Sequence, residues 1–594
     1  MGSSIPYFDD MEGEFEARLR RNTTITRTSK SEGRELTVSN PLAIVEARFS
    51  YRVLDRLYSP SFIGIERAVD GAKKYVIYEV VGVNPTHYQL PGVDPSMPTV
   101  LRKEYLETIN ESWGKSQETW IDLAAVPTSY IADVTGGGLN FVRSPYAPLP
   151  GSRAYLLSKD AVKKFLCEED GEAIGTMQGF NLPFTVSMDD LVRYHCGFFA
   201  FTGSGKSNLT SWLIRRAMKR DAGLTVTVID IAGEYAVHLL DLLESDSKVM
   251  TSESMESEEE FFSSQAIPES LEEAVGRERI ERALAGVYRR GVERLSLQED
   301  GGIDLAHVQE LLESTVSGGK TGSTAAKITL ARLTSEFFER RRLGRSTKIT
   351  ELDAESQDKL RSMLQELHDS VNEKSGLYSE VGLLLDLLKT GGEGEEKVSR
   401  LTPEKLAENL ASGKAARLNI LYVPDPIEAR IAASRLINRL LFLKKKFGNR
   451  QRVLVVLDEA QEYIPDNPVD RLYTTHSNYA VEQLLRQGRK YRLHCWLATQ
   501  RVAHLNVNAL QQLHSYFVST LPRMYDRMVI ADAFALPYEV LERSAQLETG
   551  QWIFVSFKAT KQRGVPVFLT TENNEDHLTR YIAESTSRTL RGQR

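Results

Sequence analysis

The chain has 594 residues, of which 41% are hydrophobic and 26% are charged, and its formal net charge is −7 at pH 7. This length exceeds one compact domain, and the composition is that of a soluble globular protein with no stretch near the roughly 18 apolar residues of a membrane span. The acidic balance argues against a basic surface for nucleic acid over the whole protein, although positive charge confined to a channel is compatible with it.

The N-terminus and the cysteines indicate a cytoplasmic protein. The first ten residues lack the basic and then apolar layout of a signal peptide. Cys167, Cys196 and Cys495 are isolated and odd in number, which argues against disulfides and against a zinc site. We therefore expect a cytoplasmic protein without a membrane anchor.

The first 165 residues lack long helical periodicity. They contain alternating, β-branched and aromatic runs such as 43–49 and 75–81, separated by turn signals. This pattern is typical of a small β-barrel or sandwich. We find no catalytic set of residues in this part.

A phosphate-binding loop follows. The apolar run 196–201 predicts a buried strand, residues 202–207 read Thr-Gly-Ser-Gly-Lys-Ser, and helical periodicity begins at Asn208. Gly203 and Gly205 permit positive φ, which brings backbone N–H groups close to phosphate oxygens at a helix N-terminus. Lys206 would neutralise the β and γ phosphates, and the Ser207 hydroxyl would bind Mg²⁺. The sequence thus predicts a site for ATP and Mg²⁺.

Residues 224–230 predict a buried parallel strand that ends in Asp230, and Glu234 follows shortly after. Ligands bind beyond the carboxyl ends of strands in open α/β sheets, so both carboxylates are expected at the nucleotide edge. Asp230 could equally cap a helix. Glu234 is the stronger candidate for a catalytic role.

Residues 246–404 change character, with an acidic run and several helical stretches that predict a helical insertion. Lys320, Lys327 and the basic cluster 340–342 could face DNA. The plainer explanation, helix charges that face solvent, is favoured.

The α/β pattern resumes at 417–423 and reaches the apolar strand 453–457, which ends in Asp458 and Glu459. Asp458 would hold the Mg²⁺ shell, and Glu459 would orient and activate the attacking water. A phosphate loop followed by such a pair predicts an ATPase site.

The strand 493–499 delivers Gln500 and Arg501, and Gln500 is placed to sense the γ-phosphate. Arg486, Arg489 and Arg501 are candidates for stabilising transition-state charge across a subunit boundary, while an ordinary surface arginine is the alternative for each. Strands at 515–519, 552–557 and 565–569 complete the sheet, and 571–594 predict a tail that could dock on a neighbour.

This motif set resembles the HerA branch of the HerA/FtsK motor ATPases. The matching residues are Phe201 to Asn208, Asp230 to Tyr235, Asp458 to Gln461 with Ile464 and Pro465, Arg486 to Tyr491, Ala498 to Arg501, and Gly550. On this resemblance Thr202 to Asn208 bind the nucleotide. Departures are Ala200 at the start of the loop, Ala232 after the acidic strand and Gln461 after Asp-Glu-Ala.

The resemblance implies an α/β fold with a RecA-like P-loop ATPase core, a small N-terminal β-barrel domain and a helical insertion. It divides the chain into the barrel (1–165), the first part of the core (166–245), the insertion (246–404), the second part of the core (405–570) and the tail (571–594). It also implies a homohexamer that uses ATP and Mg²⁺ to move double-stranded DNA through a central channel. A nuclease or a sirtuin-like NAD-consuming enzyme would be its partner, in DNA repair or in anti-phage defence.

Three hypotheses stay open at this stage. The first is a hexameric motor that translocates on or unwinds DNA. The second is an ATP-regulated scaffold that activates a partner effector, which the acidic balance and the lack of a basic stripe mildly favour. A secretion-type coupling ATPase of the same superfamily is a third, disfavoured by the absence of a membrane segment.

Overall fold

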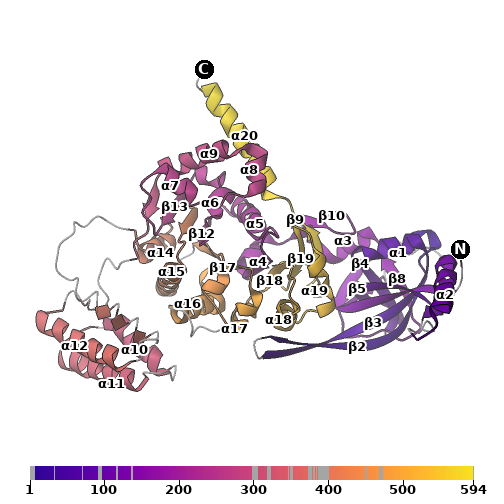
Figure 1. Cartoon of the computed structure of the whole chain (residues 1–594), viewed down its shortest axis with the longest axis horizontal. Coiled ribbons are helices and arrows are strands. Elements are labelled where there is room, and N and C mark those ends of the chain that lie inside the picture. The colour runs from indigo at the N-terminus through magenta and orange to yellow at the C-terminus, as the bar shows by residue number, and fades with distance from the viewer. Residues whose placement is uncertain are drawn as a thin grey trace.

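The computed structural model describes residues 7–592 except 32–33, 70, 91–95, 116–117, 135–137, 298–304, 318–322, 345–346, 348, 350–351, 372–376, 379–380, 383, 386–400, 449–450 and 467–472. Lys320 lies outside the described residues. Within them the strands form an N-terminal sheet and a larger central sheet, which lie side by side (Figure 1). In this part of the chain, no helix combines the length and apolar character needed to cross a membrane.

The N-terminal sheet returns on itself. Its strands are β1 (Phe8–Asp9), β2 (Ala17–Ser31), β3 (Arg34–Arg48), β4 (Ser61–Val69), β5 (Ala72–His87), β6 (Thr119–Asp133), β7 (Asn140–Arg143) and β8 (Arg153–Leu157). The path β8-β2-β3-β6-β5-β4 is closed by a further pairing of β4 with β8. Inward side chains such as Val45, Ile65 and Leu123 are fully buried in a separate hydrophobic core.

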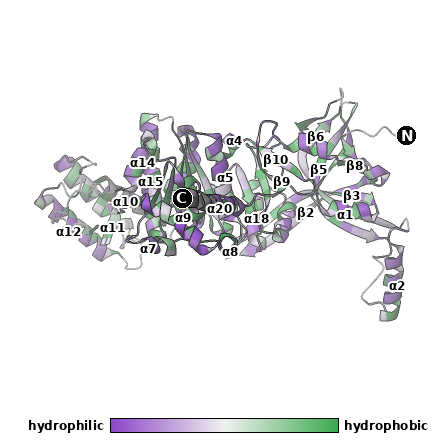
Figure 2. Cartoon of the chain, turned by 90° about the horizontal axis from the view of Figure 1, so that it is seen from above, coloured by the Kyte–Doolittle hydropathy of each residue, from purple (hydrophilic) through white to green (hydrophobic). Residues whose placement is uncertain are grey.

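Two helices in this part differ from the sequence expectation, α1 (Tyr51–Tyr58) and α2 (Thr99–Ser112). Figure 2 shows α2 standing away from the sheet. Its apolar side chains Val100, Leu101 and Leu106 are exposed, and only Ile109 is buried. A helix without one apolar face lacks the periodicity that would reveal it in the sequence.

The β2–β3 hairpin extends beyond its own sheet and reaches the central part of the molecule, below α18 (Met524–Phe534) and α19 (Tyr538–Glu542) in Figure 1. Arg27 lies 3.5 Å from Glu539 and 3.1 Å from Glu542, and Asn40 donates to Glu539 over 3.1 Å. The hairpin therefore ties the two sheets together through charged contacts.

The central sheet has the order β10-β9-β20-β19-β18-β11-β17-β16-β12-β15-β13-β14. The run from β18 to β14 is parallel, and the remaining pairs are antiparallel. The strands are β9 (Glu172–Met177), β10 (Leu182–Val186), β11 (Cys196–Phe199), β12 (Leu224–Asp230), β13 (Ser247–Thr251), β14 (Val292–Arg294), β15 (Leu418–Tyr422), β16 (Arg452–Leu457), β17 (Leu493–Thr499), β18 (Ser515–Val518), β19 (Gln551–Ser556) and β20 (Val567–Thr570). This is a mixed α/β fold.

Helices cover both faces of the central sheet because side chains alternate along each strand. In β16, Leu454 and Val456 join one core, whereas Val453, Val455 and Leu457 join the other. The first core is covered by α3 (Lys159–Leu166), α4 (Met188–Arg193), α5 (Lys206–Arg220), α6 (Tyr235–His238), α7 (Glu258–Ser263), α8 (Glu269–Val275), α9 (Arg277–Arg289) and α20 (Asn574–Gly592). The second is covered by α14 (Pro403–Ser412), α15 (Pro426–Phe447), α16 (Thr474–Gln487), α17 (Val507–Leu510), α18 and α19.

The stretch 246–404 differs from the single helical insertion that the sequence suggested. β13 and β14 pair in the central sheet, and α7 to α9 pack on its core. Only the later helices have a core of their own, formed by α10 (Leu305–Ser317), α11 (Ser323–Leu333), the π-helical turn η5 (Thr334–Arg340) and α12 (Ala354–Ser370). Figure 1 shows these helices at one end of the molecule.

The expected C-terminal tail forms α20 and packs on its own chain. Leu578 and Ile582 are buried in the core that also contains α5. The first turns of α20 therefore belong to the central part of the molecule, whereas its end projects away from it (Figure 1).

Candidate active site

The phosphate loop links β11 to α5 and has the backbone that its glycines predict. Gly203 and Gly205 have φ of 81° and 92°, a region that other residues adopt only with strain. Gly205 is the N-cap of α5, and no side chain caps the helix. N–H groups of a first helical turn lack intrahelical partners, so this loop can bind an anion.

A turn from the far end of the chain supports this loop. Thr549 Oγ1 donates to Gly203 O over 3.2 Å, and Gly550 N donates to Ser204 O over 3.4 Å. The sequence did not reveal this contact with the phosphate loop.

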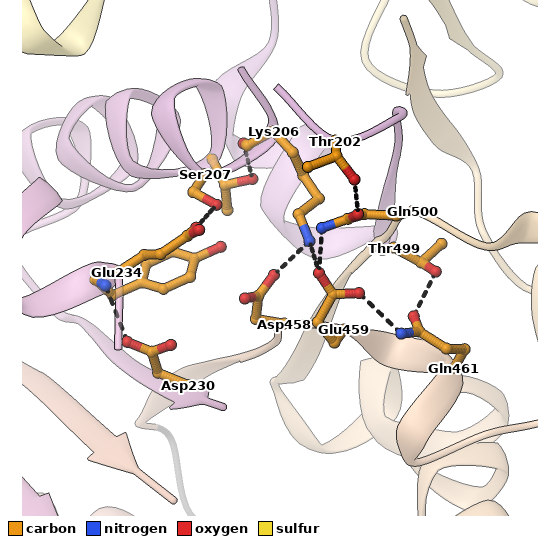
Figure 3. Close-up of polar contacts among 12 residues, drawn as sticks. Thr202, Lys206, Ser207, Asp230, Glu234, Asp458, Glu459, Gln461, Thr499 and Gln500 are labelled. Atoms are coloured by element: carbon orange, nitrogen blue, oxygen red, sulfur yellow. Dashed lines mark hydrogen bonds and ion pairs between the residues drawn. The ribbon is translucent and has the colours of Figure 1, made fainter. Parts of the chain in front are cut away.

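Lys206 lies between two carboxylates (Figure 3). Its Nζ is 3.0 Å from Asp458 Oδ1 and 2.6 Å from Glu459 Oε1. Asp458 and Glu459 follow β16, which is separated from β11 by β17, so all three residues meet at the carboxyl edge of parallel strands. Glu459 has a left-handed backbone, with φ of 48°, the kind of unfavourable conformation that clusters at functional sites.

Both oxygens of Glu459 are held by amides. Gln500 Nε2 donates to Oε1 over 2.7 Å, and Gln461 Nε2 donates to Oε2 over 2.8 Å. Gln461 in turn accepts from Thr499 Oγ1 over 2.6 Å, and Gln500 accepts from Thr202 Oγ1 in the phosphate loop. Gln461 therefore orients the carboxylate, a contact that the sequence did not reveal.

Asp230 shapes the turn that carries Glu234. Its two carboxylate oxygens accept from Gly233 N over 2.8 Å and from Tyr235 N over 2.9 Å. Ser207 Oγ then donates to Glu234 Oε2, which brings Glu234 to the first turn of α5 (Figure 3). Asp230 thus holds the turn before α6, whose N-cap is Glu234, and Glu234 reaches the site directly.

Burial and neighbouring charge set the protonation of these groups. Burial raises the pKa of Asp458 to about 6, although Lys206 opposes the shift. Burial also acts on Glu459, but Lys206 and the two amides outweigh it and lower the pKa of that carboxyl. Burial opposes the charge of Lys206 too, yet Asp458 and Glu459 hold its pKa above the usual value. Lys206 and Glu459 are therefore charged at neutral pH.

The site has oxygen atoms suited to Mg²⁺. Asp458 Oδ1 is paired with Lys206 Nζ over 3.0 Å, whereas Asp458 Oδ2 is buried and accepts no hydrogen bond. Buried carboxylate oxygens normally have a partner, so Oδ2 points to a cation or a bound water. The Ser207 hydroxyl and Glu234 lie at the same edge, and Mg²⁺ prefers such oxygen ligands together with waters and substrate phosphates.

The candidate arginines do not gather at this site. Arg501 follows β17 at the same edge, and its side chain is exposed. Arg489 lies 5.3 Å from the ring centroid of Tyr194, which Arg193 and Lys558 also approach at 5.5 and 5.3 Å. Tyr194 precedes β11, so this cluster lies at the amino ends of the strands, opposite the phosphate loop. Arg486, near the end of α16, is exposed.

Asn208, the last residue expected to bind the nucleotide, makes its side-chain contacts outside the phosphate loop. Its Nδ2 donates to Asn573 Oδ1 over 2.6 Å, and its Oδ1 accepts from Asn574 N over 2.9 Å. The side chain therefore faces the start of α20. Among the insertion candidates, Arg340 pairs with Glu336 and Arg341 with Glu355, while Lys327 is exposed.

Comparisons with known proteins agree with this geometry. The family model described as "Helicase HerA, central domain" matches residues 172–395. The DNA double-strand break repair helicase HerA of Saccharolobus solfataricus is 23% identical over 424 residues, which cover 69% of this chain and 70% of that protein.

Solved structures with a similar fold include VirB4 of Thermoanaerobacter pseudethanolicus, at 13% identity and a TM-score of 0.41, covering 68% of this chain and 97% of that chain. The plasmid coupling protein TrwB in complex with ADP and Mg²⁺ is 14% identical with a TM-score of 0.40, covering 70% of this chain and 92% of that chain. With the HerA central domain matched and the phosphate loop and Asp458–Glu459 pair in place, these comparisons support a HerA-like ATPase.

Proposed function

We propose that this protein hydrolyses ATP and, as a homohexameric ring in the cytoplasm, translocates on or unwinds double-stranded DNA that passes through a central channel. A nuclease or another effector protein would be its partner. The observation that carries the proposal is the buried set of charges in which Lys206 contacts both Asp458 and Glu459 beside a phosphate loop. The similarity to a DNA repair helicase supports DNA as the substrate.

The nucleotide would bind at the phosphate loop, with Lys206 on the β and γ phosphates and backbone N–H groups of Thr202 to Ser207 around them. Ser207 and Asp458 would hold Mg²⁺, and Glu234 would complete the edge of the metal shell. Bound Mg²⁺ would neutralise charge on the phosphates. Arrival of a phosphate would also draw Lys206 away from its present carboxylate partners.

Glu459 would orient and activate the attacking water. Its pKa is lowered, so the carboxylate is ionised and can accept a hydrogen bond from the water. Gln500 contacts both Glu459 and Thr202 of the phosphate loop, so a change at the γ-phosphate would reach the carboxylate through one side chain. We infer that Gln500 senses the γ-phosphate.

Arg486, Arg489 and Arg501 would stabilise transition-state charge in a ring. Arg489 lies at the amino ends of the strands, opposite the phosphate loop of its own subunit. It could therefore serve only the site of a neighbouring subunit. Arg501 lies at the edge of its own site and could act there or across the boundary. This difference supports Arg489 as the residue that acts in trans.

We propose domain boundaries that follow the strand pairings and the hydrophobic cores. Residues 1–165 would be the N-terminal β-barrel, consistent with the pairing of β4 and β8. The ATPase core would extend through β13 and β14, and the helical insertion would begin after them, because only the helices from α10 onward have a separate core. The end of α20 would be free to meet a neighbour.

The test is the ATP hydrolysis rate of the purified protein, with its mass in solution, with and without long linear duplex DNA. We expect a ring-sized species whose hydrolysis is stimulated by DNA and abolished by Lys206→Ala and by Glu459→Gln. The exposed residues Lys103 and Glu104 provide controls, since Lys103→Ala and Glu104→Gln make the same changes away from the site. Hydrolysis that ignores DNA would count against the motor.

A second function is an ATP-regulated scaffold that assembles and activates a partner effector, a nuclease or a sirtuin-like enzyme, in anti-phage defence. It is favoured by the net charge of −7 and by Arg340 and Arg341, whose charges are paired within the helices. Effector activity that is unchanged on adding this protein and ATP would argue against it.

A further inference from the structure

The first turn of α20 makes a hydrogen-bonded junction with two other helices. Asn574 is completely buried, and its backbone N donates to Asn208 Oδ1 over 2.9 Å. Its side-chain Nδ2 donates to His238 O over 3.0 Å, while its Oδ1 accepts from Arg215 Nη1. One residue therefore contacts two residues of α5 and, in α6, both the carbonyl and the ring of His238.

These two helices carry the oxygen atoms that would surround Mg²⁺. Asn208 is next to Ser207 at the start of α5. His238 closes the turn that begins at Glu234, because His238 N donates to Glu234 O over 3.0 Å. Asn574 thus contacts Asn208, which is next to Ser207. It also contacts His238, which lies one helical turn after Glu234.

Charged groups strengthen the same junction. Arg215 donates from Nε and Nη2 to the two carboxylate oxygens of Asp241, over 2.8 and 2.5 Å, and from Nη2 to His238 O over 3.0 Å. His577 of α20 lies 3.1 Å from Asp241. Burial opposes ionisation of Asp241, but Arg215 outweighs it and lowers the pKa of that carboxyl. A buried network whose members are satisfied holds its elements in one arrangement.

We propose that Asn574 is a positioning residue for Mg²⁺, which fixes the Ser207 hydroxyl against the Glu234 carboxylate by joining α5 to α6. The inference rests on the proposed ATPase function. It makes the C-terminal helix a part of the nucleotide site. Polar groups that orient metal ligands typically change metal affinity by about 10- to 100-fold when they are removed.

The experiment compares wild type with Asn574→Ala by equilibrium binding of a fluorescent, non-hydrolysable ATP analogue, in excess Mg²⁺ and in EDTA. In the variant we expect the gain in affinity that Mg²⁺ provides to fall about tenfold, with affinity in EDTA nearly unchanged. The Mg²⁺ concentration that gives half-maximal ATP hydrolysis should rise by a similar factor. Asn110→Ala, the same change at an exposed site on α2, is the matched control.

Leu578→Ala separates positioning from general loss of structure. Leu578 is buried on the same helix, in the core beneath α20. We expect this variant to lower Tm while keeping the Mg²⁺-dependent gain. If both Leu578→Ala and Asn574→Ala lose the Mg²⁺-dependent gain in proportion to the fall in their Tm, the positioning role is refuted. If Asn574→Ala does not fold, Asn574→Asp, which keeps the acceptor for Arg215 but removes the donor to His238, serves instead.

The two proposals fail differently. A wild-type chain whose nucleotide affinity ignores Mg²⁺ would refute the ATPase site and this inference together. A wild-type chain that responds to Mg²⁺, beside an Asn574→Ala variant that responds equally, would refute this inference alone.

Discussion

Glu79→Gln should stabilise the protein at alkaline pH, where a buried carboxyl is most costly. Glu79 lies on β5 at the junction between the N-terminal sheet and the 3₁₀ turn η11 (Arg543–Gln546), with 1% of its surface exposed. Its Oε2 accepts no hydrogen bond. Burial raises the pKa of Glu79 to about 8, and the charge of Arg543 only partly opposes the shift.

The sign and size of the effect follow from this shift. The ordinary pKa is 4.5, so between pH 4.5 and about 8 the folded chain keeps a proton that the unfolded chain has released. The free energy of unfolding therefore falls as pH rises through this window, by up to about 1.4 kcal/mol per pH unit, or about 5 kcal/mol in all. Glutamine does not titrate, so the variant lacks this loss.

The measurement is Tm by scanning fluorimetry from pH 5 to pH 8.5, for wild type, Glu79→Gln and the exposed control Glu104→Gln. Glu79→Gln should match wild type at pH 5 and exceed it increasingly toward pH 8, by roughly 2–4 °C for each kcal/mol in a unit of 150–250 residues. Glu104→Gln removes the same charge and should follow wild type throughout. A Glu79→Gln variant that is less stable at every pH would show instead that Glu79 is ionised and paired with Arg543.

Two further predictions concern catalysis. Gln461→Leu removes a hydrogen-bond donor to Glu459. Because hydrogen bonds to charged groups contribute about 1.5–3 kcal/mol, kcat should fall at least about tenfold with little change in the KM for ATP. A raised KM with unchanged kcat would contradict the orienting role. If Arg489 acts in trans, mixing inactive Arg489→Ala and Glu459→Gln subunits should restore hydrolysis at interfaces that combine an intact Glu459 with a neighbour's intact Arg489. Mixing Lys206→Ala with Glu459→Gln is the control, since both belong to one site and no interface should be repaired.

The elements that could be predicted from the sequence are those fixed by local pattern. The strands 224–230 and 493–499 were predicted to the residue, because apolar runs bounded by polar turns specify buried parallel strands. β14 is only three residues long, Val292–Arg294, and none of them is fully buried. Its strand conformation comes from pairing with β13, a tertiary contact that no local pattern announces.

The candidate site shows the same difference between residues fixed by local pattern and residues fixed by tertiary contacts. Lys206, Asp458 and Glu459 could be predicted because the chemistry of phosphate and Mg²⁺ requires those residue types at strand ends, and the structure brings them within hydrogen-bonding distance of one another. Thr549 and Asn574 could not, because each acts through a contact with a segment hundreds of residues away. Thr and Asn there satisfy only local turn and capping preferences in the sequence.

Asp230 shows why a choice between a structural and a functional role can be a false one. Its carboxylate accepts hydrogen bonds from two backbone N–H groups, which is a structural role. The turn that these bonds hold is also the one that presents Glu234 to Ser207. Burial, with Asp458 nearby, raises the pKa of Asp230 to about 7, so the protein keeps this carboxyl where its charge is unfavourable. An asparagine could accept only one of the two hydrogen bonds and would set an amide donor against the other N–H. The electrostatic cost is therefore tolerated for the sake of the turn geometry, and through it for the position of Glu234.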